Sequence, residues 1–348
     1  MGSLYNVVLK KCQAIAQITC NPTLSDMDLE YCKVLDELAQ TDSFIASRVE
    51  ACIKELNQAG DIDFDGHFLN AFDAFNEAVT YYDLNQRGVK VNNIPEASSS
   101  TPDFKVDFSY KSWDGEQISE SVFLEVKSLA FANDNIEYKK AQEAALDSNI
   151  RLEEQHNRGK QMCSSTYCVL PLGEEDRNPS FEIDLFNKKI CNNIKPSQFK
   201  YGDGSDTILY VDMSQFTFPF KKEECLPVYP DILKHFSASG RLWMLAFGRK
   251  GERIFSWPEF EGRDNIDKDL QREGILNNYD FIKGIIIASG SEKGKRTLHG
   301  FYRYDEAEQK TAIFINQVCD FVNDDKNTNG FEFYVELVEE LKKRFSAK

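Results

Sequence analysis

The sequence predicts an α/β protein with a central mixed β-sheet flanked by helices, an N-terminal helical layer and a C-terminal β-rich extension. Apolar residues recur at helical spacing through the first 60 residues and again over 67–86. Two β-prone runs, 104–110 and 121–129, then enclose an Asp-Gly turn, which is typical of a hairpin. The 348 residues are 41% hydrophobic and 28% charged, which is enough apolar material for one large core with an accessory part.

The first 60 residues are interpreted as a helical accessory region. Ser25 is the expected N-cap of its second helix, and Thr41 or Asp42 that of its third, because a short side chain with an oxygen can accept hydrogen bonds from the first amides of a helix. No residue of this region suggests chemistry. Helical spacing covers three segments, 6–18, 26–38 and 43–57.

The predicted hairpin brings charged residues together. Successive side chains of a strand point to opposite faces, so Glu125 and Lys127 share one face while Val126 points to the other. Asp103 follows Pro102 at the start of the neighbouring antiparallel strand. Two carboxylates and a lysine are therefore expected to converge at one place.

That combination suits hydrolysis of a phosphodiester. Asp103 and Glu125 are hard oxygen ligands of the kind that Mg²⁺ or Mn²⁺ takes, and the carbonyl of Val126 is a further candidate ligand. Such a metal ion lowers the pKa of its bound water and offsets the charge that develops in the transition state. Lys127 is then expected to orient that water or to stabilise the oxyanion.

Pro102-Asp103, a gap and then Glu125-Val126-Lys127 resembles the motif of the PD-(D/E)xK nuclease superfamily, whose fold is restriction-endonuclease-like. The resemblance covers roughly residues 70–215. It implies a metal-dependent nuclease with catalytic Asp103, Glu125 and Lys127, a core in the order helix, strand, strand, strand, helix, and a helical glutamate that reaches the metal.

The resemblance implies that Glu77 is this further metal ligand. It lies on the predicted helix 67–86, which Gly88 ends and a strand follows. Phenylalanines at helical spacing require one face of the helix to pack on the sheet, and Glu77 and Asp73 lie within that segment. The alternative, a solvated glutamate of a good helix former, stays open.

The net charge of −16 limits sequence-independent binding to nucleic acid, because that affinity comes from lysines and arginines that neutralise phosphates. A local basic line is expected on a helix at about 136–160. Lys140, Arg151 and Arg158 fall on one side of it and are the candidate nucleic-acid-binding residues. An ordinary solvated face is an equal alternative.

The remaining chain is expected to complete the core, 61–215, and to continue its sheet in an α/β extension, 216–348. Residues 171–205 are predicted to form an insertion of uncertain shape. The basic loops 248–251 and 291–296 are candidate clamps on a nucleic-acid backbone. The predicted strands are 166–170, 207–213, 241–248, 284–289 and 298–304, and the predicted helices lie near 230–236 and at 331–345.

Composition excludes several other classes of protein. Nine cysteines without a CxxC pair and four scattered histidines give no zinc spacing, and they indicate buried thiols in a reducing compartment. No apolar run reaches bilayer length, so a cytoplasmic protein is expected.

Three functions are compatible with the sequence. The first is a Mg²⁺-dependent nuclease that acts on DNA in restriction, repair or defence. The second is a catalytically weak module on the same fold that binds nucleic acid or a nucleotide. The third is an acidic protein that binds a basic protein partner. A homodimer would suit the first, because two sites related by a twofold axis can cut both strands.

Overall fold

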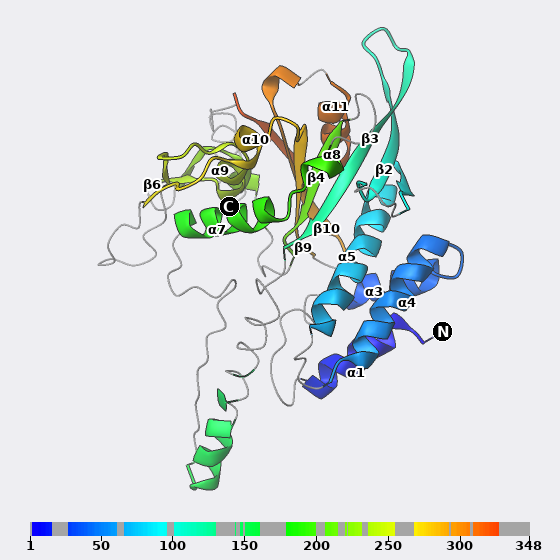
Figure 1. Cartoon of the computed structure of the whole chain (residues 1–348), viewed down its shortest axis with the longest axis vertical. Coiled ribbons are helices and arrows are strands. Elements are labelled where there is room, and N and C mark those ends of the chain that lie inside the picture. Colours follow the sequence, from blue (N-terminus) through cyan, green and yellow to red (C-terminus); the bar gives the residue numbers. More distant parts are fainter. Residues whose placement is uncertain are drawn as a thin grey trace, which may run out of the picture.

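The computed structural model shows N-terminal helices followed by a seven-stranded mixed sheet with interspersed helices (Figure 1). This confirms the predicted α/β class. The structure describes residues 2–15, 27–60, 66–95, 101–129, 143, 147–148, 150–160, 179–199, 206–214, 220, 222–231, 236–254, 268–291, 294–306 and 309–326.

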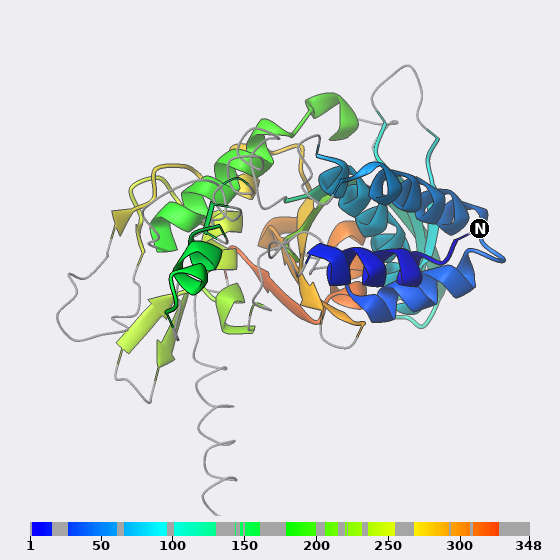
Figure 2. The ribbon, with the colours of Figure 1, turned by 90° about the horizontal axis from the view of Figure 1, so that it is seen from below.

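The N-terminal helices form one layer beside the sheet, as Figure 2 shows. Their buried side chains join a single apolar cluster that includes Tyr31, Val49 and Phe72. The layer consists of α1 (Leu4–Ile15), α3 (Leu29–Leu38), α4 (Ser43–Gln58) and α5 (His67–Gln86).

Side-chain caps set where two of these helices begin. Asp42 accepts hydrogen bonds from the amides of Phe44 and Ile45 at 2.9 and 3.0 Å, which confirms it as the N-cap of α4. Helix α3 begins three residues later than predicted because Asp28, not Ser25, caps it, accepting from the amide of Glu30 at 2.8 Å. Ser25 itself lies outside the described residues.

Helix α5 has the bounds that the sequence predicts. Gly88 follows it with a φ of 82°, a left-handed conformation that glycine adopts without a steric cost. The chain then turns directly into the first strand of the sheet.

The sheet has the order β1-β2-β3-β4-β9-β10-β11. Strand β3 is antiparallel to β2 and parallel to β4, and β4 is parallel to β9, so these central strands are covered on both faces. The predicted continuation of the sheet by the strands near 284 and 298 is confirmed. The strands are β1 (Lys90–Asn93), β2 (Phe104–Lys111), β3 (Gln117–Ser128), β4 (Thr207–Asp212), β9 (Gly284–Ser291), β10 (Arg296–Tyr302) and β11 (Phe321–Asp324).

The predicted hairpin is present as β2 and β3, in a register that pairs Phe104 with Leu124 and Lys111 with Gln117. Gly115 takes a φ of 88° in the turn. The hairpin extends beyond the pairing of its neighbours β1 and β4, so its far half projects as a two-stranded ribbon (Figure 1). The charged motif lies at the opposite, buried end.

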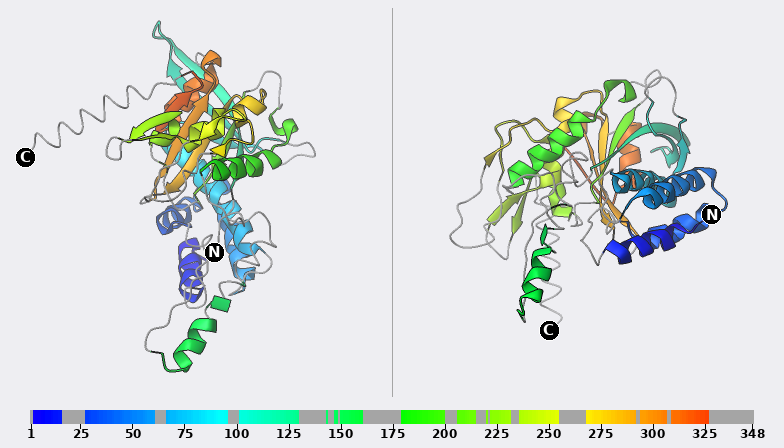
Figure 3. Two further views of the ribbon diagram at one scale, coloured as in Figure 1. Left: turned by 90° about the vertical axis from the view of Figure 1, so that its left-hand side faces the viewer. Right: turned by 60° about the horizontal axis from the view of Figure 1, so that its bottom comes forward.

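Helices cover the two faces of the sheet. On one face, α5 and α11 (Lys310–Val318) pack against even-numbered residues of β3 and β4, including Leu124 and Tyr210. On the other face, α7 (Pro179–Asn192) and α9 (Arg241–Phe247) lie over Leu209 and Val211 (Figures 1 and 3). The short helices α8 (Pro196–Phe199) and α10 (Ile275–Asn278) complete this second layer.

Two predictions for the last third are wrong. Residues 241–247 form the helix α9 and not a strand. The two ends of the predicted helix 230–236 lie in strands β5 (Val228–Asp231) and β6 (Phe236–Ser239), while residues 232–235 lie outside the described residues. Six of the seven residues of α9 are buried, so the apolar run has no period that distinguishes helix from strand. Glu224 accepts from the first amide of the helix, that of Arg241, at 2.9 Å, a tertiary contact that local sequence does not reveal.

Several predicted elements lie outside the described residues: the strand 166–170, the helix 331–345 and the first part of the helix 136–160. Residues 150–157 are helical, as predicted. Among the described helices, none has both the length and the apolar character that a membrane span requires. None of the six described cysteines forms a disulfide, and Cys32, Cys52 and Cys225 are buried.

Candidate active site

Asp103 links the two strands of the hairpin at their buried end. Its amide donates to the carbonyl of Leu124 at 3.0 Å, and its Oδ2 accepts from the amide of Val126 at 2.7 Å. The backbone pairing of β2 with β3 ends at Phe104. Beyond that point the carboxylate of Asp103, and not a backbone carbonyl, accepts the hydrogen bond from the amide of Val126. Asp103 is therefore held against the strand that carries Glu125 and Lys127.

Glu125 and Lys127 lie on one face, as predicted, and form an ion pair between Oε1 and Nζ. Glu125 is fully buried, whereas the side chain of Lys127 is 22% exposed. Burial raises the pKa of Glu125 to about 7, the nearby carboxylate of Asp103 adds to this shift, and Lys127 opposes it. The second oxygen of Glu125, Oε2, is buried without a hydrogen-bond partner. A buried carboxylate oxygen in this state is one that a cation would stabilise.

Glu77, the third predicted acidic ligand, lies on helix α5. Its Oε2 accepts from Nη1 of Arg48 at 3.0 Å, and the two side chains are about one third exposed. Burial raises the pKa of Glu77 to about 6; Arg48 opposes this shift, while the charges of Asp103 and Asp73 add to it. The charge of Asp103 acts on Glu77, and the role of Glu77 as a metal ligand stays a prediction.

Arg48 is a residue that the sequence analysis missed. It lies on α4, a helix to which no chemistry was assigned. The sequence contains a sign of its role. Arg48 lies three residues after Ile45 and next to Val49, within the helical spacing of the buried stripe that also includes Cys52. A charged residue at an apolar position of such a stripe indicates a specific partner.

Asp73, one turn before Glu77, also belongs to this neighbourhood. Burial raises its pKa to about 6; a hydrogen bond with Ser128 and the positive charges of Lys127 and Lys189 oppose the shift. The site thus contains one fully buried carboxyl group, that of Glu125, and the more accessible carboxyl groups of Asp103, Glu77 and Asp73. Lysine and arginine balance only part of their charge.

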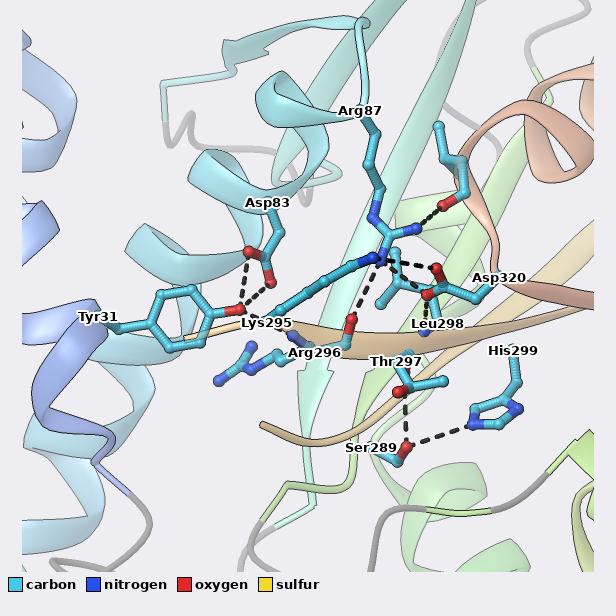
Figure 4. A network of polar contacts seen from close by, with 11 residues as sticks. Tyr31, Asp83, Arg87, Ser289, Lys295, Arg296, Thr297, Leu298, His299 and Asp320 are labelled. Carbon is cyan, nitrogen blue, oxygen red and sulfur yellow. Dashed lines mark hydrogen bonds and ion pairs between the residues drawn. The ribbon is translucent and has the colours of Figure 1, made fainter. Parts of the chain in front are cut away.

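A buried polar network supports α5 on the sheet. Asn76 donates to Ser128 at 2.6 Å and accepts from Nη1 of Arg296 at 2.6 Å. Arg296 is 2% exposed and forms an ion pair with Asp212 at 2.6 Å. Figure 4 shows the neighbouring part, where the backbone amide of Arg296 donates to the hydroxyl of Tyr31 at 2.9 Å.

Arg296, the last residue of the predicted basic loop 291–296, is consequently not available to a nucleic-acid backbone; residues 292 and 293 lie outside the described residues. Arg296 is the first residue of β10 and its charge is used inside the protein. Lys295 is 74% exposed and lies 3.8 Å from Asp320. The prediction failed because the sequence shows a run of positive charge but not the buried aspartate that neutralises part of it.

The donor set fits a divalent cation of the Mg²⁺ class. Mg²⁺ is commonly held by one or two carboxylates, with water and substrate phosphate completing its shell. Asp103 and Glu125 provide these carboxylates, and Glu125 contributes the unpartnered Oε2. Within the described ranges, no three acidic, histidine or cysteine side chains form a group that could hold a metal ion, so Glu77 does not join Asp103 and Glu125 in such a group.

The predicted nucleic-acid-binding residues are not assembled at this site. Lys140 lies outside the described residues. Arg151 and Arg158 are exposed, and Arg158 lies 3.4 Å from Glu154 one turn earlier. The helical segment that carries them projects away from the sheet in Figures 1 and 3. Their contact with nucleic acid stays a prediction.

Comparison of the chain with protein-family models, with curated proteins and with solved structures finds no match.

Proposed function

We propose that this protein is a metal-dependent nuclease of the PD-(D/E)xK type on a restriction-endonuclease-like core, acting on DNA. One observation carries the proposal: Asp103 is hydrogen-bonded to the strand of Glu125 and Lys127, while Oε2 of Glu125 is buried without a partner. A buried carboxylate oxygen without a hydrogen-bond partner is costly, so its presence suggests that a ligand completes it.

Each residue has a distinct role in this proposal. Asp103 and Glu125 hold Mg²⁺ or Mn²⁺, with the carbonyl of Val126 and the carboxylate of Glu77 as further candidate ligands. When bound, the metal ion supplies an activated water and offsets negative charge on the phosphate. Lys127, the partly exposed member of the ion pair, is placed to orient the attacking water or to stabilise the developing oxyanion.

The ion pairs of the site also explain its expected sensitivity to metal. Lys127 is paired with Glu125, and Arg48 is paired with Glu77. A divalent cation at the carboxylates reduces the attraction that holds both cations, so that they can turn towards a phosphate. Metal binding and substrate binding should therefore favour each other.

The same ion pairs favour one second candidate, a binding module on this fold with weak catalysis. If Lys127 and Arg48 remain paired with carboxylates, these two side chains do not become available to act on a phosphate. The two functions differ in whether a phosphodiester bond is broken.

Incubation of the purified protein with supercoiled plasmid tests the proposal. With Mg²⁺ or Mn²⁺ we expect nicked and linear products, and with EDTA we expect none. Plasmid that is bound but left intact in both metal ions would support the binding module. Cleavage that EDTA does not reduce would contradict the metal-dependent mechanism.

A further inference from the structure

The carboxyl end of strand β3 is paired on one edge only. Its last two residues, Lys127 and Ser128, pair with β4. On the opposite edge the pairing with β2 ends at Phe104, and among the described residues no backbone hydrogen bond from the β2 side holds β3 beyond Val126. The position of Lys127 therefore depends on what else holds the end of its strand.

Helix α5 provides such a contact through a side chain. Nδ2 of Asn76 donates to Oγ of Ser128 at 2.6 Å, and Asn76 is completely buried. Asn76 directly precedes Glu77 in α5, and Ser128 directly follows Lys127 in β3. One hydrogen bond thus connects the segments of chain that carry two of the predicted site residues.

Arg296 fixes the direction of this hydrogen bond. A guanidinium group can only donate, so its 2.6 Å contact makes Oδ1 of Asn76 the acceptor and leaves Nδ2 of Asn76 for Ser128. Arg296 is 2% exposed and forms an ion pair with Asp212, the residue that stands opposite Ser128 on β4. The three side-chain contacts therefore close into a buried ring with the pairing of β3 and β4.

Burial makes this ring resist movement of the strand end. If Ser128 moved away, Nδ2 of Asn76 would remain as a buried donor without this partner, which is unfavourable. Asn76 cannot follow Ser128 freely, because Arg296 holds its other side-chain atom. The ring therefore fixes Ser128 from two directions, from α5 and from β4.

We propose that Asn76, acting through Ser128, is a positioning residue that holds Lys127 in place beside Glu125. The proposal rests on the nuclease function proposed above and adds to it a residue outside the charged motif. Lys127 forms an ion pair with Glu125 and is 22% exposed, so its ammonium group lies at the border between the core and solvent. A displacement of about 1 Å at a catalytic group can lower a reaction rate about a hundredfold.

The test compares serine variants of a single strand. Ser128→Ala removes the acceptor of the hydrogen bond, whereas Ser128→Thr keeps a hydroxyl group. Ser121→Ala is the matched control, because it removes a hydroxyl group from another half-buried serine of β3. Single-turnover cleavage of a DNA duplex in Mn²⁺ gives the rate, and fluorescence anisotropy in Ca²⁺ gives the affinity for DNA. Thermal unfolding is measured for each variant.

We expect Ser128→Ala to cleave DNA about tenfold more slowly than wild type, with an affinity for DNA within about twofold of the wild-type value. Ser128→Thr should recover most of the rate, and Ser121→Ala should cleave at the wild-type rate. A lower unfolding temperature of Ser128→Ala with wild-type cleavage below that temperature would overturn the proposal, since it shows a purely structural role. Equally slow cleavage by Ser121→Ala would also overturn it.

A double-mutant cycle assigns the effect to Asn76. In the background of Asn76→Ala, the change Ser128→Ala should alter the rate less than about twofold, because the hydrogen bond is already absent. A full tenfold effect in that background would exclude Asn76 as the partner through which Ser128 acts. If Asn76→Ala does not fold, the serine variants decide the proposal.

A second readout does not require cleavage, so the two proposals can fail separately. The rate at which an amine reagent labels Lys127, followed by mass spectrometry without metal, reports how firmly its ammonium group is held. Ser128→Ala should raise this rate several-fold, and Ser121→Ala should not. This result in a protein that never cuts DNA would refute the nuclease and keep the positioning role. Equal labelling and equal cleavage in wild type and Ser128→Ala would keep the nuclease and refute the positioning role.

Discussion

Arg48 of helix α4 donates a hydrogen bond to Glu77 of helix α5 at 3.0 Å, within the electrostatic reach of Asp103. The ion pair joins the N-terminal helical layer to the candidate active site. Asp42 extends the same connection, since it caps α4 and accepts from the hydroxyl of Tyr81 on α5 at 3.0 Å. Helix α4 is therefore tied to α5, the helix that carries Glu77, by two side-chain contacts.

Replacing Arg48 should change metal binding and cleavage in opposite directions. Arg48→Ala leaves the charges of Glu77 and Asp103 without this cation, so we expect the affinity for Mn²⁺ to rise several-fold. Cleavage at saturating Mn²⁺ should nevertheless fall about tenfold if the guanidinium contacts the substrate phosphate. Mn²⁺ titration by electron paramagnetic resonance and single-turnover cleavage measure the two effects.

Two further variants make this test specific. Arg48→Lys keeps the charge and should keep a metal affinity near that of wild type. Glu77→Gln should weaken metal binding, because it removes a carboxylate from the site. A loss of both metal affinity and activity in Arg48→Ala, with a lower unfolding temperature, would show that Arg48 only supports the structure.

Lys127→Ala should lower the rate of DNA cleavage by about a hundredfold or more with little change in affinity for DNA, as for the loss of a contact made in the transition state. Lys105→Ala is a suitable control, because Lys105 lies on neighbouring β2, 45% exposed and 3.4 Å from Asp107. Single-turnover rates at saturating protein compare the variants. Cleavage of DNA by Lys127→Ala at the wild-type rate would contradict the proposed role of Lys127 in the transition state.

The raised pKa values of the site make the metal-free protein less stable as the pH rises. Burial raises the pKa of Glu125 to about 7 and that of Glu77 to about 6, above the values of about 4.3 for a glutamate in the unfolded chain. Between pH 4 and 7 the folded state therefore binds more protons than the unfolded state, so the free energy of unfolding decreases with increasing pH. Urea unfolding in EDTA at several pH values measures this decrease.

Glu125→Gln removes the larger part of that effect. At pH 8, in EDTA, we expect Glu125→Gln to be more stable than wild type by the order of 2 kcal/mol, since the buried carboxylate charge is then removed. Divalent metal should reverse the order, because protons and metal compete for Glu125 and only the wild type binds the ion well. A free energy of unfolding that is independent of pH between 5 and 8 in both proteins would disprove this explanation.

The buried pair of Arg296 and Asp212 should be important for stability and not directly for chemistry. Arg296→Met leaves Asp212 as an uncompensated charge that is 1% exposed, and loss of one partner of a buried pair costs about 3–5 kcal/mol. Lys295→Met, one residue earlier but 74% exposed, should change the free energy of unfolding by less than about 0.5 kcal/mol. Urea denaturation of both variants gives the comparison, and equal stabilities would contradict the structural role of the pair.

The sequence by itself determined the elements whose signals are local. Helix α5 begins at His67 and ends at Gln86 because the apolar period and Gly88 define it within about twenty residues. The hairpin, its turn and the shared face of Glu125 and Lys127 follow from alternation along a strand. The approach of Asp103 to that strand also follows, because a hairpin fixes the register of its two strands.

Only the tertiary structure decided which distant residues surround this motif. Arg48 lies 29 positions from Glu77, and Arg296 lies 84 positions from Asp212, so no local period relates the members of either pair. The apolar run of α9 was read as a strand because a segment buried on all sides loses the period that distinguishes helix from strand. Pairs of residues far apart in the sequence come into contact only when the helices pack on the sheet. A contact contributes to stability only after this packing has brought its two residues together.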